Sequence, residues 1–166
     1  MTHHLLQRRI DTPLGPLTAA RSAAGLSGLW FDGQKHHPGP LAVPEDDGRD
    51  PVLTATATAL AAYFSGQPFT LPPLDPAGTA FQREVWRALL DIPPGAPDTY
   101  GRLAQRLGRA SAARALGAAV GRNPISVLVP CHRVVGADGS LTGYAGGLTR
   151  KQALLSLEAT VEVMTA

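Results

Sequence analysis

Hydrophobic and polar positions along the first third of the chain form short runs separated by turn residues, a pattern that favours strands joined by tight turns. Residues 33–50 are rich in Gly, Pro, His and Asp, which predicts a loop. Beyond them, apolar residues recur at helical spacing from Val52 to Phe64, and Gly66 ends this predicted helix. The predicted strands are Leu5–Ile10, Leu17–Ala20 and Leu26–Phe31.

Prolines mark the middle of the chain. The stretch from Pro68 to Gly78 contains four prolines and a glycine, a composition typical of a linker. Thr79 then has the side chain of a helix N-cap, and an amphipathic helical pattern follows until Pro93. We therefore expect an N-terminal domain at residues 1–70, a linker at 71–78 and a C-terminal domain at 79–166.

Two short helices with cap residues come next. Thr99 is expected to cap a helix over Tyr100–Leu107, with Gly108 just beyond its end. Ser111 is expected to cap a second helix over Ala112–Val120. Two capped helices joined by a glycine-containing turn predict a helix-turn-helix.

The second of these helices has almost no side-chain bulk, because most of its residues are alanine or glycine. Arg114 is the one long side chain near its start. Two interpretations remain open at this point. The helix either packs tightly on a neighbour with Arg114 in solvent, or it is smooth enough to enter a nucleic-acid groove with Arg114 projecting into it.

The chain has one cysteine, Cys131, followed directly by a histidine and an arginine. The apolar run Ile125–Val129 before it predicts a buried strand, and Gly136–Gly139 after it predicts a turn. A lone cysteine beside an apolar run is often a small buried hydrophobic residue, whereas a nucleophile needs a nearby base or cation. A single cysteine forms no internal disulfide, which fits a reducing, cytoplasmic compartment.

Charge is unevenly distributed. Residues 79–166 carry ten basic and six acidic residues, against five and seven in residues 1–78. A basic C-terminal half favours an anionic partner such as nucleic acid. No signal peptide and no apolar stretch of membrane-spanning length is recognisable. The histidines at 3, 4, 36 and 37 lack cysteine partners, so no metal site is expected.

The run Asn123–Gly136, which contains Pro-Cys-His-Arg, closely resembles the signature of the O6-alkylguanine-DNA alkyltransferases, the methylated-DNA–protein-cysteine methyltransferases. The resemblance extends back through Tyr100-Gly101-Arg102-Leu103-Ala104 and Ala113–Gly117, and forward through Gly143–Leu148 to Lys151 and Glu158. It implies an α/β, ribonuclease-H-like N-terminal domain with a short antiparallel sheet and a helix. It also implies a mostly α C-terminal domain that contains a winged-helix-like helix-turn-helix.

The resemblance also implies roles for individual residues. Cys131 corresponds to the alkyl acceptor, His132 to a base that acts through a water, and Glu158 to the carboxylate that orients the histidine. Asn123 corresponds to the residue that ties the helix-turn-helix to the cysteine segment. The implied substrate-binding positions are Tyr100, Val134, Ala145 and Gly146, together with the backbone of Cys131. The implied DNA-binding positions are Arg114, Ala113, Ala115, Gly117, Gly101 and Arg109.

The implied function is irreversible, stoichiometric transfer of an alkyl group from O6 of guanine to the cysteine after base flipping. O4 of thymine is a further possible alkyl donor. The implied partner is double-stranded DNA carrying O6-alkylguanine. We expect a monomer without cofactor, metal or membrane. Two alternatives are a non-catalytic protein that binds alkyl lesions and a Cys-His-Glu hydrolase. Cys131 argues against the first, and the arginine-bearing Ala/Gly helix argues against the second.

Overall fold

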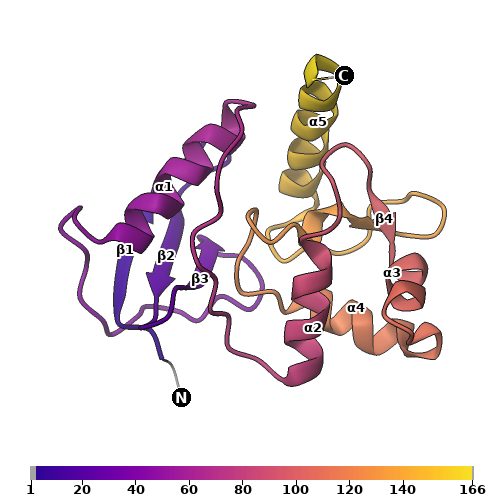
Figure 1. Cartoon of the computed structure of the whole chain (residues 1–166), viewed down its shortest axis with the longest axis horizontal. Helices are drawn as coiled ribbons and strands as arrows, with labels where there is room; N and C mark the ends of the chain where they lie inside the picture. Colours follow the sequence, from indigo (N-terminus) through magenta and orange to yellow (C-terminus); the bar gives the residue numbers. More distant parts are fainter. Residues whose placement is uncertain (1–2, 166) are drawn as a thin grey trace. The chain divides into compact units, whose positions relative to one another are not determined.

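The computed structural model describes residues 3–165, with side chains up to residue 160. Contacts divide the chain into two compact units, and the colours of Figure 1 allow each to be followed along the sequence. Unit 1 consists of Met1–Ala77 and Pro124–Leu128, and unit 2 consists of Gly78–Asn123 and Val129–Ala166. The chain therefore leaves unit 2 for five residues directly before the cysteine segment.

Unit 1 is built on an antiparallel three-stranded sheet in the order β1-β2-β3. All six residues of β3 are buried, including Trp30 and Phe31. The helix α1 packs across this sheet (Figure 1). This architecture confirms the expected α/β N-terminal fold. The strands are β1 (Leu6–Ile10), β2 (Leu17–Arg21) and β3 (Leu26–Phe31).

Local sequence explains where α1 (Pro51–Phe64) begins. The Asp50 side chain accepts a hydrogen bond of 2.9 Å from the backbone N–H of Leu53, and Pro51 occupies the first helical turn, where a missing N–H costs nothing. Leu53, Leu60 and other side chains of one face are buried. The helix is therefore fixed both by its cap and by burial of that face.

The predicted strand Ile125–Val129 is wrong beyond its first residue. Ile125 forms an isolated bridge to Leu29, and a turn follows at once. The N–H of Leu128 donates to the carbonyl of Ser126 at 2.8 Å, which places Val127 at the centre of a γ-turn with φ of 69°. A β-branched residue in this left-handed region is strained. A continuous apolar run does not distinguish a buried strand from a buried turn, which explains the error.

In unit 2, α2 (Ala80–Leu89) begins with a complete capping box. Thr79 accepts from the N–H of Gln82 at 3.1 Å, and the Gln82 side chain accepts from the N–H of Thr79 at 3.0 Å. The buried Trp86 indole N–H donates to the carbonyl of Ala119 at 2.8 Å. This bond fastens α2 to the second helix of the helix-turn-helix.

The helix-turn-helix consists of α3 (Tyr100–Arg106) and α4 (Ala113–Gly121), with a short 3₁₀ turn at Ala110–Ala112 between them. Thr99 caps α3 by accepting from the N–H of Arg102 at 3.2 Å. The expected cap at Ser111 is wrong, since Ser111 lies inside the 3₁₀ turn and its side chain makes no cap bond to either helix. The expected mostly α second domain is confirmed.

A small parallel pairing organises the region around the cysteine. β4 (Asp98–Thr99) pairs with β5 (Val134–Val135), with Asp98 opposite Val134. Since Tyr100 follows β4 and the 3₁₀ turn Cys131–Arg133 precedes β5, the pairing ties the start of α3 to the cysteine segment. The last element is α5 (Leu148–Thr165). Among the described helices, none combines the length and apolarity needed to span a membrane.

Candidate active site and nucleic-acid interface

Cys131 opens the short 3₁₀ turn, and only 7% of its surface is exposed. The buried Asn123 side chain donates to the carbonyl of Val129 at 2.9 Å, and the N–H of Cys131 donates to the same carbonyl at 2.8 Å. Burial raises the pKa of the Cys131 thiol, while a hydrogen bond with Asn123 and the charge of Lys151 act in the opposite direction. The thiol is therefore protonated at rest and needs a base.

The base lies in the next residue. His132 is fully buried, and its Nε2 lies 2.6 Å from Oε2 of Glu158, a carboxylate with 2% exposure on α5. Nδ1 of His132 has no hydrogen-bond partner among the described residues. The bond to Glu158 assigns the proton to Nε2, so the lone pair of Nδ1 is the one open to receive a proton.

Burial keeps the imidazole neutral, and hydrogen bonds and nearby charges keep the carboxylate ionised. Burial lowers the pKa of His132, with Glu158 opposing and Arg133 and Lys151 assisting that change. Burial alone raises the pKa of Glu158, but hydrogen bonds from His132 and Arg133 more than offset this effect and lower it to about 2. At neutral pH the arrangement is thus a carboxylate, a neutral imidazole and a thiol.

Arg133 holds Glu158 with two hydrogen bonds. Its Nε donates to Oε1 at 2.8 Å, and Nη2 donates to Oε2 at 3.1 Å. Its Nη1 donates to the carbonyl of Ile92, just beyond the end of α2, at 2.6 Å. Arg133 belongs to the motif around the cysteine, but its role is not predictable from the motif, because its partner lies 25 residues away along the chain.

Lys151 is a second residue within the resemblance whose role is not predictable from the sequence. It is entirely buried, and its ammonium donates to the carbonyls of Val134 at 2.6 Å, Thr142 at 2.7 Å and Gly143 at 3.4 Å. These acceptors belong to β5 and to the loop before α5. Lys151 therefore holds that loop against the segment that follows the cysteine.

The same loop carries the other candidate substrate positions. The Thr142 hydroxyl donates to the Tyr100 hydroxyl at 3.5 Å, a long contact that sets Tyr100 beside the loop. The carbonyl of Gly146 accepts from Arg150 at 3.2 Å, and Ala145 lies next to it in a turn. Tyr100, Val134, Ala145 and Gly146 are thus linked through β5, the loop and Lys151.

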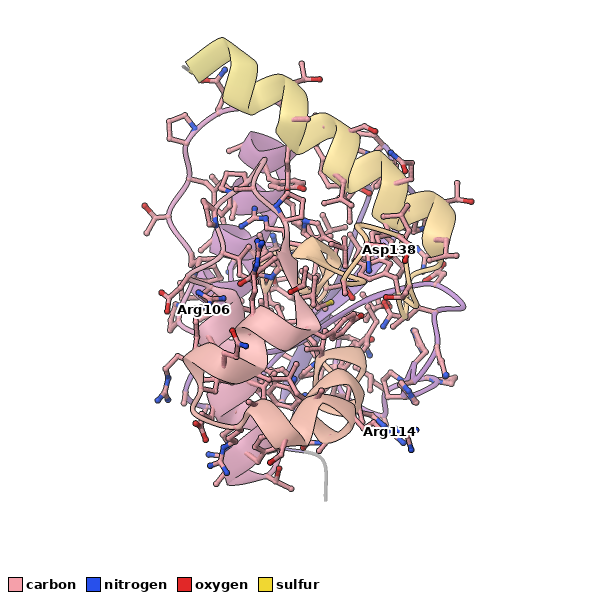
Figure 2. The ribbon with its side chains drawn as sticks, turned by 90° about the vertical axis from the view of Figure 1, so that its right-hand side faces the viewer. Arg106, Arg114 and Asp138 are labelled. Carbon is pink, nitrogen blue, oxygen red and sulfur yellow. The ribbon has the colours of Figure 1, made fainter. Side chains whose placement is uncertain are left out.

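The candidate DNA-binding residues lie on the exposed part of the helix-turn-helix. Ala113, Arg114 and Ala115 at the start of α4 are exposed, as is Gly101 on α3. A Cβ on Gly117 would lie 3.9 Å from the Tyr100 ring, so this glycine faces the preceding helix at ordinary contact distance. Figure 2 shows Arg114 and Arg106 projecting from opposite sides of the helix pair.

The arginines of this region differ in how they are held. Arg109 pairs with Glu84 at 3.2 Å and lies over the Phe81 ring, and Arg106 pairs with Asp98 at 2.5 Å. Arg102 and Arg114 have no ion pair among the described side chains. Arg102 and Arg114 are therefore available to an external anion, as is the exposed Arg122 at the end of α4.

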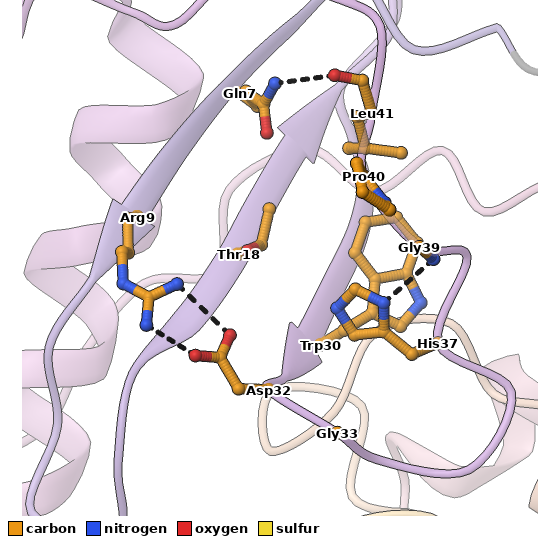
Figure 3. Close-up of a pocket in the computed structure, with 10 residues that line it drawn as sticks. All are labelled: Gln7, Arg9, Thr18, Trp30, Asp32, Gly33, His37, Gly39, Pro40 and Leu41. Atoms are coloured by element: carbon orange, nitrogen blue, oxygen red, sulfur yellow. Dashed lines mark hydrogen bonds and ion pairs between the residues drawn. The ribbon is translucent and has the colours of Figure 1, made fainter.

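Unit 1 has a pocket of its own, of about 390 Å³, between the sheet and the loop 33–41 (Figure 3). Several of its polar groups are paired with one another: Arg9 with Asp32, and the Gln7 amide with the carbonyl of Leu41 at 3.1 Å. None of the predicted site residues lines it. Within the described part of the chain, no cluster of His, Cys, Asp or Glu is suited to a metal ion.

Comparison with known proteins agrees with this geometry. The family described as "6-O-methylguanine DNA methyltransferase, DNA binding domain" matches residues 80–160, and "6-O-methylguanine DNA methyltransferase, ribonuclease-like domain" matches residues 5–76.

Named relatives are similar along nearly the whole chain. The methylated-DNA–protein-cysteine methyltransferase of Mycobacterium tuberculosis H37Rv is 46% identical over 153 residues, covering 91% of this chain and 90% of that protein. The one from Haemophilus influenzae is 41% identical, covering 89% and 82%. The crystal structure of Mycobacterium tuberculosis OGT in complex with DNA superimposes with a TM-score of 0.85 at 44% identity, covering 95% and 94%. The chain therefore belongs to the methylated-DNA–protein-cysteine methyltransferase family.

Proposed function

We propose that the protein repairs DNA by moving an alkyl group from O6 of guanine to the sulfur of Cys131, once per molecule. The observation that carries the proposal is the buried thiol beside a neutral imidazole whose Nε2 is held by Glu158 at 2.6 Å. Family membership and the DNA complex of the Mycobacterium tuberculosis relative support it.

The chemistry needs a thiolate, and His132 supplies the base. Nδ1 of His132 takes the proton of Cys131 through a water, and Glu158 stabilises the resulting imidazolium. The sulfur attacks the alkyl carbon, a carbon–sulfur bond forms, and the bond from carbon to O6 breaks. The electron pair passes into the guanine ring, which regains its proton at a ring nitrogen. The product thioether is a poor leaving group, so the protein acts once.

Tyr100 and the loop before α5 are proposed to bind the extruded base. A phenol hydroxyl at Tyr100 donates a hydrogen bond to a ring nitrogen and offsets the negative charge on the leaving guanine. Backbone groups of Cys131, Val134, Ala145 and Gly146 read the edge of the base. The hold of Lys151 on this loop supports the proposal, since a site of this kind needs fixed backbone groups.

The helix-turn-helix is proposed to bind the duplex. The alkyl group lies within the base stack, so the nucleotide must leave the helix before transfer. The small residues Ala113, Ala115 and Gly117 allow α4 to approach the duplex closely, and Gly101 and Arg109 lie beside it. Arg114 fills the place that the extruded nucleotide leaves in the base stack. The exposure of Arg114 without an ion pair among the described residues supports this role.

Intact-mass spectrometry tests the function. After incubation with duplex DNA containing O6-methylguanine, the protein is expected to gain the mass of one methyl group per chain and no more. Cys131→Ala and Cys131→Ser serve as controls, with no gain and with DNA affinity retained. DNA binding without any mass gain in the unaltered protein would instead favour the lesion-binding alternative. Repeated removal of methyl groups from the DNA by each protein molecule, without a mass gain of the protein, would favour the hydrolase.

A further inference from the structure

We infer that Arg133 is a positioning residue for the proton acceptor: it carries the counter-charge of Glu158 and so keeps His132 a neutral base with Nδ1 open. The inference rests on the proposed function only for the identity of the alkyl donor. It concerns the protonation state of the site, which is measurable without DNA.

Geometry gives Arg133 the stronger hold on the carboxylate. Both oxygens of Glu158 accept from Arg133, at 2.8 and 3.1 Å, whereas only Oε2 contacts His132. Two parallel bonds from a planar guanidinium fix the plane of a carboxylate as well as its position. Oε2 is therefore shared between the guanidinium and the imidazole, and its orientation toward Nε2 of His132 is set by Arg133.

The guanidinium is itself anchored. Its side chain is 12% exposed, and Nη1 donates to the carbonyl of Ile92 at 2.6 Å. The orphan carbonyls at a helix C-terminus carry partial negative charge, so a cation beside the end of α2 is favourable. Arg133 therefore links the end of α2, its own turn and α5 around one buried carboxylate.

Charge balance then decides where the proton resides. A buried carboxylate needs a positive partner, and without Arg133 the nearest group able to become one is His132. His132 would gain a proton on Nδ1 and would no longer accept one from the thiol. The other charged group that acts on His132 is Lys151 on α5. Cys131 precedes His132 in the chain, and the Tyr144 ring packs edge-on against the imidazole. Arg133 differs from these groups because it both acts on His132 and donates to the two oxygens of Glu158.

The experiment follows the pH dependence of Cys131 reactivity. Because the chain has one cysteine, the rate of alkylation by iodoacetamide reports this thiol alone. In Arg133→Gln, loss of the guanidinium raises the pKa of His132. The acid limb of the rate profile, where the rate rises with pH as His132 loses its proton, is therefore expected to move to higher pH. The rate near pH 6 is expected to fall about tenfold, the change that one pH unit gives. The same profile measured with free O6-benzylguanine is expected to move in parallel.

Two variants separate charge from packing. Arg133→Lys keeps the cation without the two-pronged geometry, so its acid limb is expected to stay close to that of the unaltered protein. Arg9→Gln removes an arginine from an exposed ion pair with Asp32 in unit 1 and is expected to leave the profile unchanged. If Arg133→Lys moves the limb as far as Arg133→Gln, or neither moves it, Arg133 has only a packing role and the inference is overturned.

A measurement on the unaltered protein covers the case in which Arg133→Gln does not fold. The ¹⁵N shifts of His132 at neutral pH are expected to show a proton on Nε2 and none on Nδ1. An imidazolium at neutral pH would overturn the inference. Failure of the O6-benzylguanine reaction, with the iodoacetamide profiles as expected, would refute the proposed function and leave the role of Arg133 supported.

Discussion

Lys151 Nζ donates a hydrogen bond of 2.6 Å to the carbonyl of Val134, three residues beyond the cysteine. The same ammonium donates to the carbonyl of Thr142 at 2.7 Å, so one buried cation on α5 joins β5 to the loop that carries the candidate base-binding groups. Burial lowers the pKa of this ammonium, and the negative charge of Cys131 in its thiolate form opposes that change. The relationship makes the loop position dependent on a single side chain.

Lys151→Met is expected to slow alkyl transfer and to lower the free energy of unfolding by about 2 kcal/mol, since the carbonyls of Val134 and Thr142 lose a charged donor. Lys35→Met, at an exposed position of the loop in unit 1, is the matched control and is expected to change neither quantity. The measurements are urea unfolding and the rate of modification by O6-benzylguanine. Equal effects of the two substitutions would contradict the role of Lys151.

The stability of the protein is expected to depend on pH through Cys131. Burial raises the pKa of this thiol above its ordinary 9.0, so the unfolded chain releases the proton at lower pH than the folded one. The stabilising contribution is complete below pH 9.0 and is lost as pH rises through the folded-state pKa. In this window the free energy of unfolding is expected to fall by up to about 1.4 kcal/mol per pH unit.

Cys131→Ala isolates this effect, because every other titrating group is retained. Chemical unfolding from about pH 7 to 11 is expected to show the unaltered protein losing unfolding free energy relative to Cys131→Ala only above the ordinary thiol pKa. It reports the thiol together with Lys151, since the two groups interact. Parallel curves throughout would show that the thiol titrates alike in the folded and unfolded chains.

Arg114→Ala is expected to slow repair of duplex DNA markedly while leaving the reaction with free O6-benzylguanine nearly untouched, because only the duplex reaction needs the nucleotide to be extruded. Arg114→Lys is expected to restore duplex repair only in part, since an ammonium does not stack as a planar guanidinium does. Each variant is described by two rates, one per substrate. A similar loss in both would assign Arg114 a structural role.

The corrected helix start gives a further prediction. Thr79→Ala removes a capping box and Thr99→Ala removes the cap of α3, so each is expected to cost about 1 kcal/mol of unfolding free energy. Ser111→Ala removes no cap bond and is expected to be close to neutral. The comparison is made by urea unfolding of the three variants. A loss of unfolding free energy in Ser111→Ala as large as that in Thr79→Ala would show that Ser111 is a cap, as the sequence predicted.

The sequence by itself determined the elements whose signals are local. Thr79, Thr99 and Gly108 mark helix ends through hydrogen bonds and backbone conformations that involve only near neighbours. The strands of unit 1 follow from residue pattern and intervening turns. The resemblance around Cys131 indicated the family and the candidate site, because a motif of this specificity identifies a family from residue order alone.

Only the tertiary structure decided the features that depend on partners far along the chain. The run before Cys131 turns at Val127 because pairing with Leu29 ends after one bridge, and hydrophobic periodicity does not encode such a partner. Ser111 resembles a cap, yet the 3₁₀ turn withdraws it from the helix start. The roles of Arg133 and Lys151 arise from contacts with Glu158, Ile92 and Thr142, which the fold brings together across three elements and a loop. Because these charges are buried, the contacts contribute strongly to the stability of the site, since an isolated charge is costly where water is excluded.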